Sequence, residues 1–157
     1  MNPAHWHLIL THAPVFGTLC ALLFLLTGIF QKNEALKRIG FWLLVFTAVL
    51  VLPTYLTGSP ASTYMKRIMP TKPMDVADQH EEIAILALVA VLFTGVLSLT
   101  GLIIFKKGKA LAGWMVGLVL VLSLISVAAL GWTANLGGKI SHTEIRAVDP
   151  YSGTPEH

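Results

Sequence analysis

Four long apolar segments alternate with shorter polar stretches along the whole chain. They cover residues 8–30, 39–57, 83–105 and 110–136, and none of them contains Asp, Glu, Lys or Arg. An α-helix needs roughly 20 apolar residues to cross a bilayer, and apolar residues here follow one another without the alternation of a β-barrel strand. The pattern predicts an all-α membrane protein, a four-helix transmembrane bundle that could consist of two tandem helical hairpins. We expect a single transmembrane domain over residues 1–157.

Composition supports a protein embedded in the lipid bilayer. Hydrophobic residues make up 55% of the 157 residues and charged residues only 12%, whereas soluble domains contain about 25% charged residues. Four helices without a polar face could not all be buried in a soluble protein of this size. The net charge of +3 comes from clustered loop residues, so it predicts a membrane topology and no nucleic-acid partner.

The basic residues predict the orientation of the helices. Six of them lie in the two short connections, namely Lys32, Lys37, Arg38, Lys106, Lys107 and Lys109. Because short cytoplasmic loops are enriched in Lys and Arg, we expect both connections in the cytoplasm of a bacterium. Both termini, the 58–82 loop and the tail from residue 137 would then lie in the periplasm, as in a multi-pass inner-membrane protein. No basic residue precedes Lys32, so we expect the first segment to be kept and not removed as a signal peptide.

The two halves of the chain resemble each other. Residues 26–30 (Leu-Thr-Gly-Ile-Phe) precede the first basic turn, and residues 99–105 (Leu-Thr-Gly-Leu-Ile-Ile-Phe) precede the second. Each half also opens with a histidine at the outer end of its first helix, and we pair His12 with His80 on this basis. A repeat of this kind places the first and third helices in equivalent positions about an axis along the membrane normal.

All six histidines fall on the predicted outer face. They are His5, His7, His12, His80, His142 and His157. Imidazole is the commonest metal ligand among side chains, and four-helix bundles hold haem or metal with histidines from different helices. We expect His5 and His157 to be solvated terminal residues and the other four to be candidate ligands. Interfacial hydrogen bonding or helix capping is the alternative role for His12 and His80.

Glycines end the second and fourth apolar segments close to these histidines. Gly58 follows the second segment, and Gly137 and Gly138 follow the fourth. Glycine allows a close approach of the backbone to a ligand, and it is also an ordinary helix stop. We expect the ordinary stop. We also expect the 58–82 loop to pack over the end of the bundle, because its prolines stiffen it.

The first functional hypothesis is a membrane electron-transfer protein that holds b-type haem. The motif Cys-x-x-Cys-His is absent, so haem would be bound non-covalently. We expect His12 and His80 to be the paired axial ligands, with His7 or His142 able to replace either of them. Basic residues of the outer face would neutralise the haem propionates, chiefly Arg67 and Lys139.

Two alternatives stay open beside haem. The histidines could instead form a non-haem copper, zinc or iron site, since four of them exceed what one haem needs. The chain could also be a structural or assembly subunit without a cofactor. The segments lack the mid-membrane acids and bases that transport sites usually contain, so the sequence favours an electron carrier or complex subunit over a transporter or a stand-alone enzyme.

Four motifs also carry a resemblance to a known family. They are, in chain order, His7-x4-His12-x-Pro14, Thr57-Gly58, His80, and Gly137-Gly138-x3-His142. This pattern resembles an uncharacterised bacterial family of four-helix membrane proteins, and the likeness covers nearly the whole chain. Some members of that family are fused to Rieske-type iron–sulfur or cytochrome domains. The resemblance implies a respiratory setting, and so electron transfer, and it assigns no cofactor. Under the haem hypothesis, quinol and other redox subunits such as cytochrome or iron–sulfur proteins could be partners, although the sequence shows no decisive quinone site.

Overall fold

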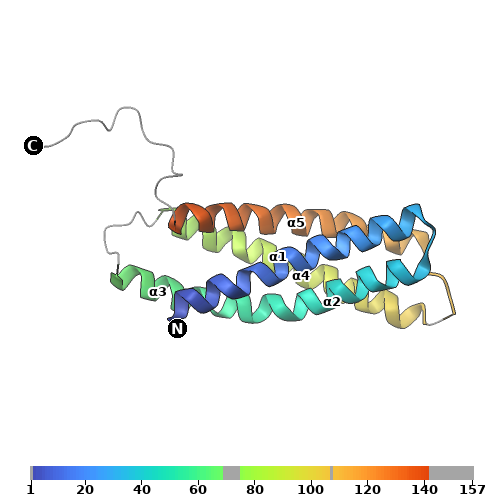
Figure 1. The fold of residues 1–157 in the computed structure, drawn as a ribbon, viewed down its shortest axis with the longest axis horizontal. Coiled ribbons are helices and arrows are strands. Elements are labelled where there is room, and N and C mark those ends of the chain that lie inside the picture. Colours follow the sequence, from blue (N-terminus) through green and yellow to red (C-terminus); the bar gives the residue numbers. More distant parts are fainter. Residues whose placement is uncertain (1, 69–74, 107, 142–157) are drawn as a thin grey trace, which may run out of the picture.

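The computed structural model describes residues 2–68, 75–106 and 108–141, and in these residues it contains helices and no strand. The helices are α1 (Pro3–Phe30), α2 (Glu34–Leu56), α3 (Gly58–Ile68), α4 (Asp75–Ile104) and α5 (Gly113–Ser141). Four helical stretches are long and apolar enough to cross a membrane, and Figure 1 shows α1, α2, α4 and α5 side by side in an elongated bundle. The predicted four-helix transmembrane bundle is confirmed.

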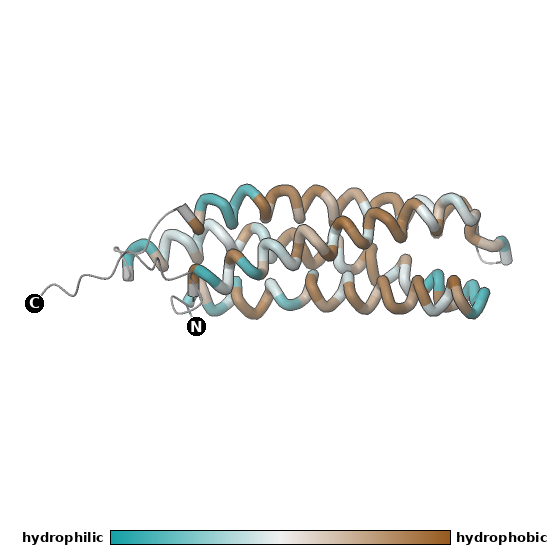
Figure 2. The backbone as a smooth tube through the Cα atoms, turned by 90° about the horizontal axis from the view of Figure 1, so that it is seen from above, coloured by the Kyte–Doolittle hydropathy of each residue, from teal (hydrophilic) through white to brown (hydrophobic). Residues whose placement is uncertain are grey.

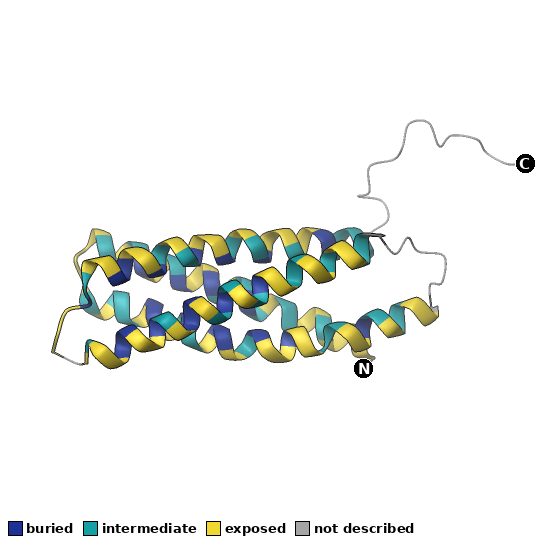
Figure 3. Ribbon diagram, turned by 180° about the vertical axis from the view of Figure 1, so that it is seen from behind, coloured by how far each residue is buried: buried dark blue, intermediate teal, exposed yellow. Residues whose placement is uncertain are grey.

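The four long helices form a closed ring in the order α1, α2, α4, α5. Neighbours in this ring pack against each other, so α1 lies diagonally opposite α4, and α2 lies diagonally opposite α5. Apolar residues dominate the middle of every long helix, and polar residues gather towards the two ends of the bundle (Figure 2). Exposed stripes run along the outside of the helices (Figure 3) and include large side chains such as Phe16, Trp42 and Trp114. Such a surface suits contact with lipid.

The repeat predicted from the sequence is present in the packing. The buried residues of α1 are Pro14, Thr18, Ala21, Leu25 and Gly28. The residues that lie 73 positions later are also all buried, and they are Ala87, Val91, Thr94, Ser98 and Gly101. An offset of 73 is the spacing between the repeated segments at 26–30 and 99–105. The two hairpins, α1–α2 and α4–α5, therefore bury equivalent faces.

The offset of 73 residues between the two halves corrects the predicted pairing of His12 with His80. An offset of 73 makes His7, and not His12, the counterpart of His80. The counterpart of His12 is Ile85, and both side chains are exposed on the outside of the bundle. The expected equivalence of His12 and His80 rested on their shared position at the start of a helix, which did not take the register of the repeat into account.

Two helix boundaries also differ from the sequence prediction. The predicted 58–82 loop contains α3 and the first two turns of α4, and α3 packs on α1 and α2. The expected packing of this loop on the bundle is thus confirmed for α3, whereas residues 69–74 lie outside the described part. Helix α5 continues through Gly137 and Gly138 to Ser141, so the expected helix stop at these glycines is wrong.

One guanidinium ties together the two short connections at the basic end of the bundle. Arg38 Nη2 donates hydrogen bonds to the carbonyl oxygens of Phe105, Lys106 and Lys109. We expect Arg38→Gln to lower the free energy of unfolding by about 1.5–3 kcal/mol, because charged hydrogen bonds to the last carbonyls of α4 and its turn are lost. Unfolding in detergent titrated with denaturant would measure this, and an unchanged midpoint would contradict it.

Candidate functional site at the outer end of the bundle

The outer end is the end formed by the start of α1, the junction of α2 and α3, the start of α4 and the end of α5. Asn2 begins α1 there, since its side chain accepts a hydrogen bond from the His5 N–H at 2.9 Å. One turn further along, the half-buried His7 ring faces α2. Its Nδ1 lies 3.1 Å from the Thr54 carbonyl oxygen and 3.1 Å from Thr57 Oγ1. A carbonyl oxygen can only accept, so Nδ1 carries the hydrogen and the neutral ring keeps a free lone pair on Nε2.

His80 repeats this arrangement in the second hairpin. It lies in the second turn of α4, is half-buried and faces α5. Its Nδ1 lies 3.0 Å from the carbonyl oxygen of Thr133. By the same reasoning Nδ1 donates and Nε2 is the free ring nitrogen. Both histidines are therefore held in the same tautomer by a backbone carbonyl of the neighbouring helix.

A glycine lies beside each imidazole. A Cβ atom added to Gly58 would lie 3.5 Å from His7 Cε1, which is ordinary van der Waals contact, whereas one added to Gly137 would lie 3.3 Å from His80 Cε1, which is tight. Gly137 therefore serves the close approach of the α5 backbone to the His80 ring, which explains why a glycine lies inside a helix that does not stop there.

A second component of the site was not predicted from the sequence. Each histidine contacts a Thr-x3-Gly pair, Thr54 of α2 with Gly58 at the start of α3, and Thr133 with Gly137 in α5. The two pairs are separated by 79 positions, the same spacing that relates the buried Leu44, Thr47 and Val51 of α2 to the buried residues of α5. Aligning the second and fourth helices on their small residues could have found this motif.

The two imidazoles lie at the same end of the bundle. They come from the diagonal helices α1 and α4, and each is hydrogen-bonded to the next helix of its own hairpin. Within the described residues, no three His, Cys, Asp or Glu side chains come together as a metal-binding group. The arrangement is therefore a two-histidine site to which all four long helices contribute.

His12 is placed elsewhere. It lies five residues after His7, which is about 140° around the helix axis, so the two rings cannot face the same neighbour. The His12 ring is exposed, donates from Nδ1 to the Leu8 carbonyl of its own helix at 2.7 Å, and stacks on Phe16 at a ring separation of 6.2 Å. The structure thus gives His7, and not His12, a setting equivalent to that of His80.

The other candidate residues are spread around the outer end. Arg67 lies near the end of α3, and Lys139 lies in the last turn of α5, two residues after Gly137. His5 is exposed in the first turn of α1. His142 and His157 lie outside the described residues.

A comparison with protein families identifies the family of the chain. The family model described as predicted membrane protein (DUF2231) matches residues 3–148. The chain belongs to this family. The matched region contains all five helices and both sets of His and Thr-x3-Gly residues. No curated protein and no solved structure matches the chain.

Proposed function

We propose that this chain is a membrane electron-transfer protein whose outer end holds one b-type haem between His7 and His80. The observation that carries the proposal is the pair of imidazoles on diagonal helices, each donating from Nδ1 to a backbone carbonyl. Metal-bound histidines almost always donate their other ring nitrogen to a carbonyl, carboxylate or water, which orients the ring and raises its basicity. The chain would supply Nε2 of both rings as axial ligands.

The number of ligands favours haem over a non-haem metal. Haem iron takes at most two protein ligands, whereas zinc sites use three or four. A copper, zinc or iron site would have to recruit a side chain from beyond the described residues, such as His142, because no third ligand joins the pair within them. His7 and His80 would hold the haem, and the bound group would supply one-electron transfer.

The residues around the two histidines would have separate roles in holding the haem. The Thr54 and Thr133 carbonyls would hold the imidazoles in position, and Gly137 would leave space for the His80 ring. Lys139 is the better candidate to neutralise a propionate, because it lies within one turn of Gly137. Arg67 lies nine residues after Gly58 along α3, a helical rise of about 13 Å, and is more distant from the site.

The experiment that tests this function is a spectrum and a cofactor analysis of the protein purified in mild detergent from haem-producing cells. We expect about one haem b per chain and the sharp visible bands of a reduced low-spin cytochrome. If the protein contains one equivalent of copper, zinc or iron and lacks that spectrum, the function is a non-haem metal site and not a haem site. Colourless, metal-free protein would leave the structural subunit as the function.

The positive-inside rule supports an orientation in which the site faces the periplasm of a bacterial inner membrane. In that position the site would exchange electrons with quinol in the bilayer, or with a cytochrome or iron–sulfur subunit on the outer side. We expect a reporter that is active only in the periplasm to be active when fused after His157 and inactive when inserted after Lys109. The reverse result would place the histidine pair in the cytoplasm.

The close contact at Gly137 gives a further prediction. Gly137→Leu should push the His80 ring away from the Thr133 carbonyl and lower haem affinity by roughly 10–100-fold, the usual effect of losing an outer hydrogen-bond partner. The control is Gly131→Leu in the same helix, because a Cβ at Gly131 meets nothing within 4 Å. Haem titration of both purified variants measures the effect, and equal affinities would contradict the proposed role of Gly137.

A further inference from the structure

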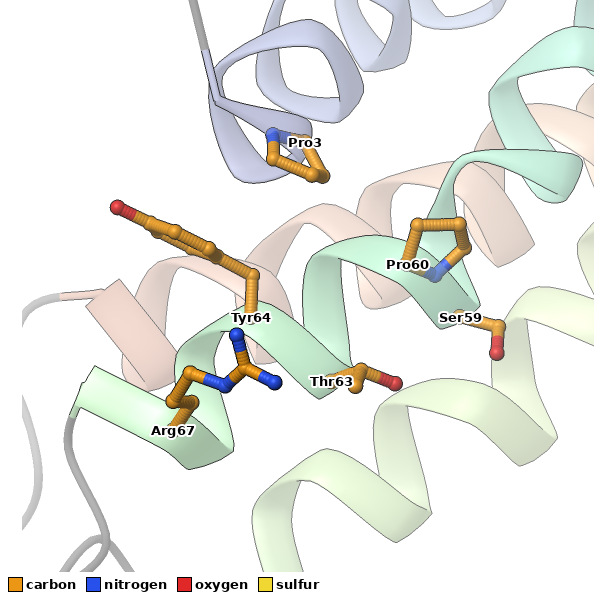
Figure 4. A pocket seen from close by; sticks show the side chains of 6 residues that line it. All are labelled: Pro3, Ser59, Pro60, Thr63, Tyr64 and Arg67. Atoms are coloured by element: carbon orange, nitrogen blue, oxygen red, sulfur yellow. The ribbon is translucent and has the colours of Figure 1, made fainter.

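A cavity lies at the outer end between the first turn of α1 and the amphipathic helix α3. Its volume is about 420 Å³. Figure 4 shows its lining, which consists of Pro3, Ser59, Pro60, Thr63, Tyr64 and Arg67. The proposed haem site does not use this cavity, because its ligands come from the next turn of α1 and from α4.

Polar side chains that can donate hydrogen bonds line the cavity, and one of them, Arg67, is positively charged. Thr63 and Arg67 are four residues apart and share a face of α3, and Figure 4 shows the guanidinium directed towards the Thr63 side chain. The Tyr64 hydroxyl accepts a hydrogen bond from the Asn2 amide at 3.4 Å and is directed away from Thr63 and Arg67 in Figure 4, so it is not one of these donors. Ser59 adds a further hydroxyl. These groups match an anion.

No carboxylate neutralises this cation within the described part of the chain. The lining contains no Asp or Glu, and the ion pair found among the described residues, Lys37 with Glu34, lies at the opposite end of the bundle. A guanidinium beside hydroxyl donors and without a carboxylate is suited to phosphate oxygens, which it can bind with two parallel hydrogen bonds.

The position of the cavity identifies the source of the phosphate. Helix α1 has 28 residues, a length of about 42 Å, whereas the hydrocarbon core of a bilayer is about 30 Å thick. The first turn of α1 and the adjacent α3 therefore lie at the level of the lipid headgroups. Pro3, Pro60 and the Tyr64 ring provide apolar walls beside the polar groups, as the glycerol region of a lipid requires.

We propose that this cavity binds the phosphate of an anionic phospholipid from the leaflet at the outer end, with Arg67 as the principal contact. The proposal is independent of the haem site. Pro3 and His7 are four residues apart on one face of α1, so the bound headgroup would lie one turn beyond the His7 ring and would link α1 to α3.

The test is native mass spectrometry of the full chain with phosphatidylglycerol added in increasing amounts. We expect Arg67→Gln to weaken phosphatidylglycerol binding roughly tenfold, the usual effect of losing a charge-assisted hydrogen bond. The matched control is Lys66→Gln, which removes the neighbouring charge of α3 outside the cavity lining and should change binding less than about twofold. The phosphatidylglycerol affinity of Arg67→Lys should fall between those of wild type and Arg67→Gln. Lysine keeps the positive charge but cannot donate the two parallel hydrogen bonds of the guanidinium.

Three results would overturn the proposal. Equal loss in the Lys66 and Arg67 variants would mean diffuse charge attraction and no built site. Displacement of the lipid by millimolar inorganic phosphate would make free phosphate the ligand of the cavity and not the lipid, and equal binding of diacylglycerol would show that phosphate is not what the cavity recognises. Loss of haem with full lipid retention in Arg67→Gln would make Arg67 a propionate partner. If Arg67→Gln loses lipid binding but keeps its haem content, the lipid site is lost without the haem site, so the two proposals are tested separately.

Discussion

Replacing either His7 or His80 with Ala is expected to lower the haem content of the purified protein by at least tenfold. Loss of an outer hydrogen-bond partner alone costs roughly 10–100-fold in metal affinity, and removal of an axial ligand should cost more. Both histidines should show the same effect, because the repeat gives them equivalent carbonyl partners and equivalent glycines. The measurement is the ratio of haem to protein after purification.

The matched control for this experiment is His12→Ala. His12 lies on the same helix as His7, but its ring is exposed and bonded to its own helix, so its removal should leave the haem content at the wild-type value. Loss of haem in His12→Ala with retention in His7→Ala would restore the pairing drawn from the sequence and would remove the structural basis of the proposed site.

Substituting Gly95 with Leu is expected to separate the two hairpins and to destabilise the bundle. Gly95 lies where α4 crosses α2, and an added Cβ would be 2.3 Å from Ala48 Cβ and 3.2 Å from the Leu44 carbonyl oxygen. Neither atom is the end of a flexible side chain, so the backbones must move apart. Small residues permit such close approach between membrane helices. We expect a loss of about 3 kcal/mol in the free energy of unfolding, at the upper end of the cost of overpacking.

The control for this substitution is Gly117→Leu in α5. A Cβ at Gly117 meets nothing within 4 Å, and leucine favours a helix over glycine by up to about 1 kcal/mol. The control should therefore be neutral or slightly stabilising in denaturant titrations in detergent micelles. Equal destabilisation of both variants would show that the α2–α4 contact is not the tight interface described above.

The four helices could be predicted from the sequence because long uncharged apolar runs have few alternatives in a bilayer. The ends of the helices were harder to predict from the sequence. Gly137 looked like a helix stop, since sequence alone does not show that a histidine 57 positions earlier packs against it. Helix α3 was not predicted, because the segment that contains it is rich in prolines and was expected to be a loop. One of these prolines, Pro60, lies in the first turn of the helix, where proline is tolerated.

The histidine pair shows how far the site could be predicted. The sequence showed that the histidines share one end of the bundle and that the halves repeat, and both observations hold for the described residues. Choosing between His7 and His12 required the register, which the segments at 26–30 and 99–105 already contain as an offset of 73. An alignment of the second and fourth helices could have found Thr54 and Thr133, but not that their backbone oxygens accept hydrogen bonds from the imidazoles, because a backbone oxygen has no signature in the sequence.

The central claim is that one iron is held by two imidazoles, and the ferric electron paramagnetic resonance spectrum of the haem-loaded wild-type protein tests it most directly. Two neutral imidazole ligands predict a low-spin ferric signal from about one haem per chain, with no high-spin component. A high-spin signal, or a low-spin signal that persists unchanged in the His7→Ala, His80→Ala double variant, would contradict the account.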